Sequence, residues 1–370
     1  MPDKIVILAN NSGGLYDFRG MLMSELISRG DTVIALTPFD DRIDELTALG
    51  IKLIETPINR RGINPTEDFK LFRNYKKLLK DLTPDLVITY TIKPNVYGGL
   101  ACRLLKIPYA ANITGLGTAF QGKGMLRKLV TLMYKVGLKK AKTVFFENSE
   151  NRQIFIDEKI VNGEKTCLLN GAGVNLEHFE VTEYPEDNET IRFLFIGRVM
   201  KEKGIDELFK AMQLLREDGI DCALDVVGGC EEDYTEKLKA YENEGWLNYH
   251  GYQNDVRPFI SAAHCFVLPS WHEGMANTNL ECSAMARPVI TSNIHGCLEA
   301  VEDGVTGFLC EKQNPESLHN AMKRFCGLTL DEKKNMGLAA RKRMEEIFDK
   351  RKVVAETINY LDFLSILKGD

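Results

Sequence analysis

Residues 192–215 read RFLFIGRVMKEKGIDELFKAMQLL and contain a complete strand, loop and helix pattern. Arg192–Ile196 is almost wholly apolar, as expected of a strand covered on both faces in a parallel sheet. The stretch Ile205–Leu215 has the apolar spacing of an amphipathic helix. Between them, the segment that begins at Gly197 and ends at Gly204 favours a short loop. This stretch therefore predicts a strand–loop–helix unit in the middle of the chain.

The same alternation continues on both sides of this unit. Further strand-like runs are Lys4–Ala9, Thr32–Leu36, Lys52–Thr56, Asp85–Tyr90, Tyr109–Asn112, Thr143–Glu147, Cys222–Val227, Cys265–Pro269 and Pro288–Ser292. Helical patterns occupy Phe18–Arg29, Glu67–Asp81, Asn95–Leu105, Met125–Lys140, Asp233–Asn243 and Asn277–Ala286, and a last helix begins near Arg351. Strands that alternate with longer helices predict the α/β class, with parallel sheets covered on both faces.

The length of 370 residues exceeds what one core usually supports, so we expect two domains. An acid-rich segment, Val181–Thr190, interrupts the alternation and is typical of a linker. We therefore predict an N-terminal α/β domain over 1–180 and a C-terminal α/β domain over 181–350. A C-terminal helix over 351–370 could return to the N-terminal domain.

Composition excludes several classes of protein. There is no apolar run long enough to span a membrane, and the nine cysteines are scattered without a Cys-x-x-Cys pair, which favours a reducing cytoplasm. Residues 1–180 carry a net charge of +5 and the remainder −11, and residues 86–146 hold ten Lys/Arg and no acid. A basic N-terminal half suits an anionic partner, such as a phosphorylated acceptor, a membrane surface or nucleic acid.

Familiar catalytic motifs are absent from the sequence. It lacks the serine-hydrolase elbow, the Walker A loop, the zinc-protease helix motif and the dinucleotide-binding glycine fingerprint. It also lacks Asp-x-Asp, and all six histidines lie at position 178 or later. If the ligand is a nucleoside diphosphate, cationic side chains must therefore neutralise it in place of a metal.

Such cations occur in the loop of the central strand–loop–helix unit. Arg198 and Lys203 lie five residues apart, directly before a helix N-terminus that adds N–H groups and partial positive charge. Arginine can hold phosphate oxygens with two parallel hydrogen bonds, and lysine acts as a point charge. Two solvated loop cations remain the alternative interpretation.

The first strand is followed by Gly13 and Gly14, and Tyr16 and Arg19 come next at the start of a helix. The glycines would let a ligand approach the backbone, because they lack a Cβ atom. A plain turn is the alternative for an isolated Gly-Gly pair.

Two acids, Glu273 and Glu281, frame the stretch EGMANTNLE. If both lay inside one helix, they would be separated by about 12 Å along its axis and would point roughly 80° apart. Glu273 is better placed in the loop after Cys265–Pro269, with Glu281 one to two turns into the following helix. In that geometry each carboxylate can contact a different part of one long ligand. It does not favour an acid and nucleophile pair, which requires carboxyl groups about 5–5.5 Å apart. Two solvated acids remain possible.

Taken together, the Gly-Gly pair, Gly-Arg-x4-Lys-Gly, and Pro-Ser-x-x-Glu-Gly-x6-Glu resemble glycosyltransferase family 4. The similarity continues through Pro288-Val-Ile and Glu302-Asp-Gly-x-x-Gly-Phe, so it extends over nearly the whole chain. The resemblance implies a retaining reaction and the GT-B fold, in which two Rossmann-like domains enclose a deep interdomain cleft. It also implies that the N-terminal domain over 1–180 binds the acceptor and that the C-terminal domain over 181–350 binds the nucleotide sugar. The stretches Ile92–Gly98 and Asn112–Phe120 resemble bacterial enzymes that extend lipid-linked glycans for capsule, O-antigen or glycoprotein assembly.

Carried onto this sequence, the resemblance implies specific roles. Glu273, Arg198 and Lys203 would be catalytic: Glu273 would contact the donor sugar, and the two cations would neutralise the departing diphosphate. Glu281 would bind the ribose, and the other donor contacts would come from Gly13, Gly14, Gly274, Met275, Ala276 and Asn277. The acceptor would contact Tyr16, Arg19, Lys93, Thr114 and Lys123. Thr114 stands where many relatives carry a histidine, and a hydroxyl can still form hydrogen bonds there.

The predicted reaction moves a hexose or N-acetylhexosamine from a nucleotide diphosphate sugar, a UDP-sugar above others, to a hydroxyl of a polyprenyl-diphosphate-linked glycan. We expect no metal, no other cofactor and no nucleic-acid partner. Three alternatives stay open: a nucleotide-sugar epimerase of the same fold, an NAD-dependent oxidoreductase and a non-catalytic binding protein.

Residues 124–142 combine helical apolar spacing with several cations. They could hold the enzyme on an anionic membrane at the inner face of the plasma membrane, where a lipid-linked acceptor resides. The alternative is a helix that covers the first domain and turns a cationic face outward. We therefore expect a cytoplasmic enzyme with a candidate peripheral membrane contact.

Overall fold

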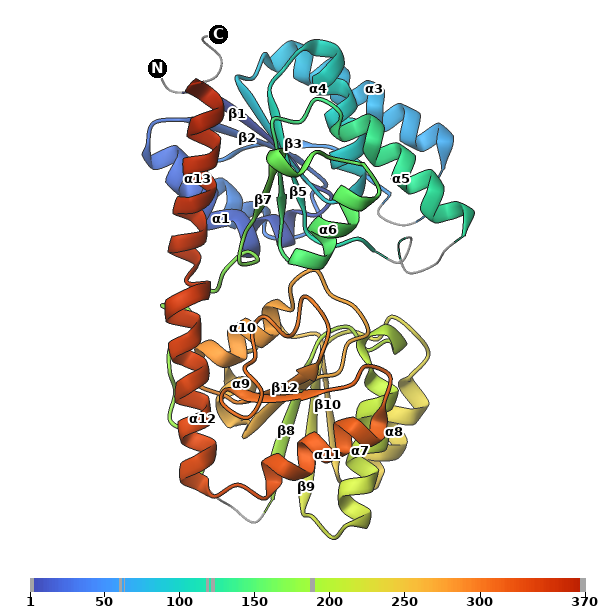
Figure 1. Cartoon of the computed structure of the whole chain (residues 1–370), viewed down its shortest axis with the longest axis vertical. Helices are drawn as coiled ribbons and strands as arrows, with labels where there is room; N and C mark the ends of the chain where they lie inside the picture. Colours follow the sequence, from blue (N-terminus) through green and yellow to red (C-terminus); the bar gives the residue numbers. More distant parts are fainter. Residues whose placement is uncertain are drawn as a thin grey trace. The chain divides into compact units, whose positions relative to one another are not determined.

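The computed structural model describes residues 3–59, 62, 64–117, 120, 124–186 and 190–366, with the backbone alone for 363–366. The chain divides into two units (Figure 1). Unit 1 comprises residues 1–172 and 351–370, and unit 2 comprises residues 173–350.

Unit 1 is built on a seven-stranded parallel sheet in the order β3-β2-β1-β4-β5-β6-β7. In chain order its strands are β1 Lys4–Leu8, β2 Thr32–Thr37, β3 Lys52–Glu55, β4 Leu86–Tyr90, β5 Tyr109–Ile113, β6 Thr143–Phe146 and β7 Thr166–Leu168. The central strands are almost wholly buried because helices cover both faces. Strand order reverses between β1 and β4, and in open α/β sheets ligands bind outside the carboxyl ends of the strands at such a reversal.

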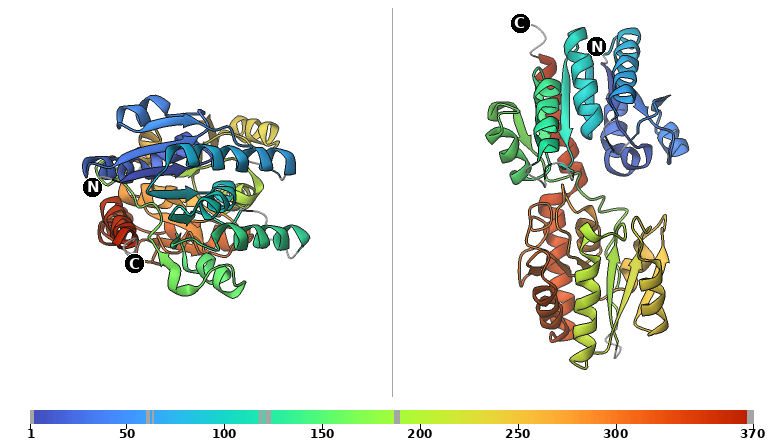
Figure 2. Two further views of the ribbon diagram at one scale, coloured as in Figure 1. Left: turned by 90° about the horizontal axis from the view of Figure 1, so that it is seen from above. Right: turned by 90° about the vertical axis from the view of Figure 1, so that its right-hand side faces the viewer.

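Alternate residues of β1 enter two different cores, as the pleat of a strand requires. Ile5 and Ile7 pack with α1 and α13, whereas Val6 and Leu8 pack with α3, α4 and α5. Figure 2 gives two further views of these helices around the sheet. The elements are α1 Ser12–Ser28, α2 Ile43–Ala48, α3 Pro65–Leu82, η1 Pro94–Gly98, α4 Gly99–Leu105, α5 Met125–Leu138, α6 Ser149–Asp157, η3 Gly163–Lys165 and α13 Lys350–Ile366.

The first helix begins six residues before the predicted start at Phe18. The side chain of Asn11 caps it by accepting the N–H of Gly14 at 2.6 Å. Gly13 and Gly14 therefore lie in the first turn of α1, and the interpretation of this pair as a loop or plain turn was wrong. The helix predicted over Asn95–Leu105 is present, but its first turn is the wider η1 segment.

Unit 2 repeats the architecture with six parallel strands in the order β10-β9-β8-β11-β12-β13. They are β8 Ile191–Ile196, β9 Cys222–Val227, β10 Leu247–Gly251, β11 Cys265–Leu268, β12 Val289–Ser292 and β13 Gly307–Cys310. The helical elements are η4 Lys201–Lys203, α7 Ile205–Glu217, α8 Thr235–Asn243, α9 Arg257–Ala262, α10 Asn277–Ala284, α11 Pro315–Cys326, α12 Leu330–Arg343 and η5 Met344–Phe348. Here the order reverses between β8 and β11, so the loops after these two strands flank the expected ligand position.

The described part of the predicted linker, residues 181–186, is tied to unit 2 by one buried arginine. Arg287 is fully buried and donates hydrogen bonds to the backbone carbonyls of Thr182 at 3.3 Å and Glu183 at 2.7 Å. Its guanidinium carbon also lies over the ring of Tyr184, 5.3 Å from the ring centroid, which is within the roughly 6 Å typical of a cation–π contact. Burial lowers the pKa of Arg287 to about 10.

Candidate active site

The loops after β8 and β11 are in direct contact through a glycine. Gly204 has φ +73°, and a Cβ atom there would lie 2.1 Å from the carbonyl oxygen of Pro269. Only glycine satisfies both the left-handed backbone and this close approach. Gly228, after β9, similarly packs on the carbonyl of Gly197. These two glycines therefore allow the loops after β8, β9 and β11 to pack closely at the carboxyl edge of the unit 2 sheet.

This packing brings Lys203 and Glu273 together from 70 residues apart. The Nζ atom of Lys203 contacts Oε1 of Glu273, and the hydroxyl of Ser270 donates to the same oxygen at 2.7 Å. Their side chains are 20% and 12% exposed, so the ion pair is largely screened from water. The predicted diphosphate cation and the predicted sugar-binding acid therefore form one cluster, in which an anionic ligand would compete with Glu273 for the ammonium group.

Arg198 lies in the same loop but is far more accessible. Its side chain is 54% exposed, and its Nη1 atom is 3.9 Å from Oε2 of Glu231. An exposed pair at this distance contributes little to stability, so the guanidinium can turn toward a ligand at small cost. This loop therefore carries one cation that is held in an ion pair with Glu273, Lys203, and one accessible cation, Arg198.

Glu281 and Glu273 occupy the two positions predicted for them. Glu273 lies in the loop after β11, and Glu281 is half-buried in the second turn of α10. The helix begins at Asn277, whose Oδ1 is buried without a hydrogen-bond partner among the described residues. A hydrogen-bond donor of a bound ligand could satisfy this acceptor.

The backbone predicted to contact the donor is only partly available. The N–H of Ala276 donates to the carbonyl of Gly296 at 2.7 Å, and Met275 is buried. Gly296 has φ +91°, and a Cβ atom there would lie 2.8 Å from the carbonyl oxygen of Glu273. Gly296 therefore fixes the loop that contains Gly274, and sequence reasoning did not assign it this role.

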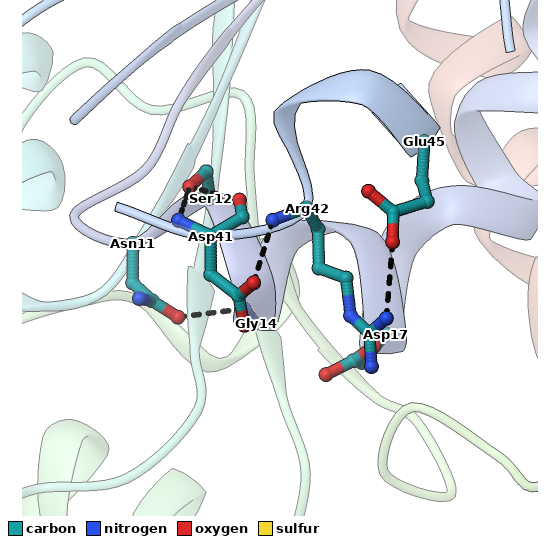
Figure 3. Close-up of polar contacts among 7 residues, drawn as sticks. All are labelled: Asn11, Ser12, Gly14, Asp17, Asp41, Arg42 and Glu45. Atoms are coloured by element: carbon teal, nitrogen blue, oxygen red, sulfur yellow. Dashed lines mark hydrogen bonds and ion pairs between the residues drawn. The ribbon is translucent and has the colours of Figure 1, made fainter. Parts of the chain in front are cut away.

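In unit 1, carboxylates and an amide surround the N-terminus of α1. Figure 3 shows the hydrogen bond from Gly14 to Asn11 and the contacts of Ser12 with Asp41. Asp40 accepts the N–H of Ser12 at 2.8 Å. Burial alone would raise the pKa of Asp40, but hydrogen bonds from Ser12 and Asn11 lower it below its ordinary value. A phosphate approaching Gly14 would have to displace Asn11.

Gly13 packs against Asp41, since a Cβ atom at Gly13 would lie 3.1 Å from Oδ2 of Asp41. The predicted contact of Gly13 and Gly14 with the donor thus stays a prediction, and the structure adds a condition to it. Asp40 and Asp41 were missed because neither lies near the glycines in sequence; the Asp-Asp pair shortly after β2 was the only signal.

Two cations predicted to bind the acceptor are neutralised inside unit 1. Arg19 is buried, contacts Oε1 of Glu147 and lies over the ring of Tyr90. Burial raises the pKa of Glu147, and the charge of Arg19 opposes that rise. Lys93 is 2.8 Å from Asp68, with both side chains largely buried. Acceptor binding by either cation would require its ion pair to open.

The other predicted acceptor contacts differ in position. Tyr16 is half-buried in α1 and packs against the core, and Thr114 follows β5 at the carboxyl edge of the sheet. Lys123 lies outside the described residues.

The carboxyl edge of unit 1 also holds a feature that the sequence did not indicate. Thr91, directly after β4, has φ +72°, which is rare for a β-branched residue. Its Oγ1 and the Oδ1 of buried Asn112 have no hydrogen-bond partner among the described residues. Strain and orphan polar atoms at the reversal of strand order are typical of ligand-binding sites.

Two family models match the chain. Residues 4–148 match the model "Glycosyl transferase 4-like", and residues 178–343 match "Glycosyl transferases group 1". The chain is 27% identical over 370 residues to the N,N'-diacetylbacillosaminyl-diphospho-undecaprenol alpha-1,3-N-acetylgalactosaminyltransferase of Campylobacter jejuni. The aligned region covers 95% of this chain and 96% of that protein. It is 28% identical to the UDP-Gal:alpha-D-GlcNAc-diphosphoundecaprenol alpha-1,3-galactosyltransferase of Escherichia coli, over 78% of this chain and 77% of that protein.

Solved structures share the fold of both units. A glycosyltransferase from Rickettsia africae has a TM-score of 0.80 at 19% identity and covers 98% of this chain and 99% of its own. HepE of Anabaena, solved with UDP and glucose, has a TM-score of 0.80 at 16% identity and covers 97% of this chain and 99% of its own. The predicted family is confirmed by the parallel sheet in each unit, by the match of both units to glycosyltransferase models and by the bacterial relatives. The chain belongs to the group 1, family 4-like glycosyltransferases of the GT-B fold.

Proposed function

We propose that this enzyme moves a hexose or N-acetylhexosamine from a UDP-sugar to a hydroxyl of a polyprenyl-diphosphate-linked glycan, with retention at the anomeric carbon. The single observation that carries this proposal is the cluster of Lys203, Glu273 and Ser270 at the reversal of strand order in unit 2. The names of the two relatives above, both of which act on undecaprenyl-diphosphate-linked sugars, support the acceptor class.

In the proposed reaction, the bond between the anomeric carbon and the donor diphosphate breaks, and the acceptor oxygen bonds to the same face of that carbon. The acceptor proton passes to an oxygen of the departing diphosphate. Lys203 and Arg198 stabilise the negative charge that grows on the diphosphate, a term that often dominates catalysis of group transfer. Glu273 holds the sugar hydroxyls and Glu281 holds the ribose, and these cations would make a metal unnecessary.

A donor and stereochemistry experiment tests this proposal. Purified enzyme is incubated with a panel of UDP- and GDP-sugars and a short polyprenyl-diphosphate glycan, and EDTA is added to half of the samples. We expect one UDP-sugar to be used, with or without EDTA, and the anomeric proton coupling of the product to match that of the donor. An altered free donor in the absence of acceptor would instead identify an epimerase, and an inverted product would refute retention.

Helix α5 supports a peripheral contact with an anionic membrane. Its exposed side carries Met125, Leu129, Leu132 and Val136, which are 87%, 44%, 58% and 37% exposed. At 100° per residue these four lie within about 60° of one another, opposite the buried Tyr134. The outer face of α5 therefore carries an apolar stripe as well as cations. Large exposed apolar stripes typically mark protein or membrane contacts.

Cations of α5 and of its C-cap residue lie beside this apolar stripe. Lys128, Lys135 and Lys139 lie on one side of it by the same helical geometry. An amphipathic helix of this kind can lie in the bilayer surface, with its cations near anionic headgroups. None of the described helices is long and apolar enough to cross a membrane. We propose that α5 holds the enzyme peripherally on the cytoplasmic face of the membrane.

Vesicle co-sedimentation tests the membrane contact. Replacing Leu129 and Leu132 with glutamine should reduce binding to anionic vesicles at least tenfold, because full burial of one leucine is worth about 1.5–3 kcal/mol. Leu104, which is 51% exposed on α4, provides a matched control for loss of a surface leucine. Equal losses in the α5 variant and the Leu104→Gln control, or binding that does not depend on anionic lipid, would refute the role of α5.

A further inference from the structure

A basic pocket of about 540 Å³ lies beside α5 in unit 1. Five cations line it, and no acidic side chain does; the cations are Arg103, Lys135, Lys139, Lys159 and Lys165. Its apolar lining includes Leu138 at the end of α5 and Val144 in β6. We refer to this feature as the basic pocket.

The basic pocket lies at the amino-terminal edge of the sheet. Arg103 belongs to the last turn of α4, shortly before β5; Lys139 lies between α5 and β6; and Lys165 directly precedes β7. Among the described residues, the donor and acceptor contacts predicted in unit 1 follow strands β1, β4 and β5 and lie at the opposite edge. Five residues of β5 separate the two edges by about 16 Å. The basic pocket is therefore distinct from the candidate active site.

Helix ends do not account for the charge of the basic pocket. Helices α4, α5 and α6 all end near it, and each C-terminus carries roughly −0.5 of a charge. One cation serves such an end directly, since Nη1 of Arg103 donates to the carbonyl of Val136 at 3.2 Å. Three helix ends offset about −1.5 against five positive charges, so roughly three remain unbalanced.

The neighbouring acids have hydrogen-bond partners other than the cations of the basic pocket. Glu158 accepts a hydrogen bond from Arg127 at 2.9 Å, and Glu164 accepts one at 3.2 Å from Asn162, which also lines the pocket. Within the described ranges, no ion pair joins an acid to any of the four lysines of the basic pocket. Clustering like charges without counterions costs free energy, which a bound anion would recover.

We propose that the basic pocket binds the phosphate of an anionic phospholipid headgroup. The inference rests on the proposed membrane contact of α5, because Lys135 and Val136 belong to both features. Val136 lies on the exposed apolar stripe, and Lys135 flanks it. A phospholipid matches this arrangement: its headgroup phosphate satisfies the cations while its acyl chains meet the stripe. Free phosphates share the headgroup chemistry but would leave the stripe in water.

The test compares two double variants that remove the same charge. Lys159→Gln with Lys165→Gln removes two cations of the basic pocket without altering α5. Lys52→Gln with Lys77→Gln removes two exposed lysines from β3 and α3, outside the basic pocket. Binding is measured to vesicles of neutral phosphatidylcholine, of phosphatidylcholine with phosphatidylglycerol, and of phosphatidylcholine with polyprenyl diphosphate at equal total charge. Inorganic pyrophosphate is added as a soluble competitor.

We expect the pocket variant to bind phosphatidylglycerol vesicles roughly 10- to 30-fold more weakly than the wild type, and the control variant to stay within about twofold. Equal losses in both variants would reduce the effect to net charge and refute the pocket. Preference for polyprenyl diphosphate at equal charge, or full release by pyrophosphate, would assign it to another phosphate source and refute the phospholipid.

Sugar transfer to a soluble short-chain acceptor separates this inference from the proposed function. The pocket variant should retain wild-type turnover on that acceptor and an unchanged melting temperature. Weak vesicle binding by the pocket variant together with normal turnover would support the role of the basic pocket. A wild-type protein without any turnover would refute the proposed sugar transfer, independently of the basic pocket. A wild-type protein that transfers sugar but does not bind anionic vesicles would refute the headgroup site and the membrane contact of α5, and it would leave the proposed sugar transfer intact.

Discussion

Replacing Lys203 with methionine tests whether its contact with Glu273 is structural as well as catalytic. Methionine keeps most of the side-chain volume and removes the charge. Removing one partner of a fully buried ion pair costs about 3–5 kcal/mol. Both side chains here retain some exposure, and Ser270 still donates to Glu273 at 2.7 Å. We therefore expect unit 2 to lose about 2 kcal/mol of unfolding free energy.

A double-mutant cycle isolates this interaction. Urea unfolding is measured for Lys203→Met, Glu273→Gln and the two changes combined. The double variant should regain most of the loss, because it leaves no uncompensated charge. In a unit of this size, 2 kcal/mol corresponds to a melting shift of roughly 4–8 °C. Lys201→Met is the matched control: it changes an exposed lysine of the same loop and should cost less than about 0.5 kcal/mol.

Turnover provides the second half of the test. If Lys203 also stabilises the departing diphosphate, kcat should fall by roughly 100-fold or more in the single variant and stay low in the double variant. Recovery of stability without recovery of turnover would separate the two roles. The reasoning is refuted if Lys203→Met is as stable as the wild type, or if the double variant regains full turnover.

Three further predictions follow from the structure. Glu281→Gln should mainly weaken UDP affinity, whereas Glu273→Gln should mainly slow transfer; isothermal titration and kinetics giving the same pattern for both would contradict the divided roles. Gly204→Ala should destabilise unit 2 by at least about 1–3 kcal/mol in thermal unfolding, because its φ is +73° and its Cβ would lie 2.1 Å from the oxygen of Pro269. The lowered pKa of Asp40 stabilises unit 1 above about pH 4, and this contribution is lost as the pH falls through the lowered value. Asp40→Asn should therefore flatten the stability profile below about pH 4, and an unchanged profile would contradict the assignment.

Local patterns predicted most of the fold. The strand over Arg192–Ile196 and the helix from Ile205 appear as β8 and α7, because buried parallel strands and amphipathic helices leave strong periodic signals. Short strands were less visible. β7 spans only Thr166–Leu168, and β10 contains Asn248 and His250, so neither has a continuous apolar run.

The sequence predicted which residues belong to the site better than it predicted which of them contact one another. The loop position of Glu273 and the helical position of Glu281 followed from local spacing, and the structure confirms them. The contact between Lys203 and Glu273 did not, because it depends on two loops meeting through Gly204. Likewise, the pairing of Arg19 with Glu147 bridges 128 residues and has no local signal.

The most direct test of the central claim is the stoichiometry of the reaction. The wild-type enzyme is incubated with its preferred UDP-sugar and a polyprenyl-diphosphate glycan, and the released UDP and the lengthened glycan are counted in the same sample. The proposed function predicts one UDP released for each sugar added to the lipid-linked acceptor, and no UDP released when the acceptor is omitted. UDP released without lengthening of the glycan, or a donor altered without release of UDP, would contradict it.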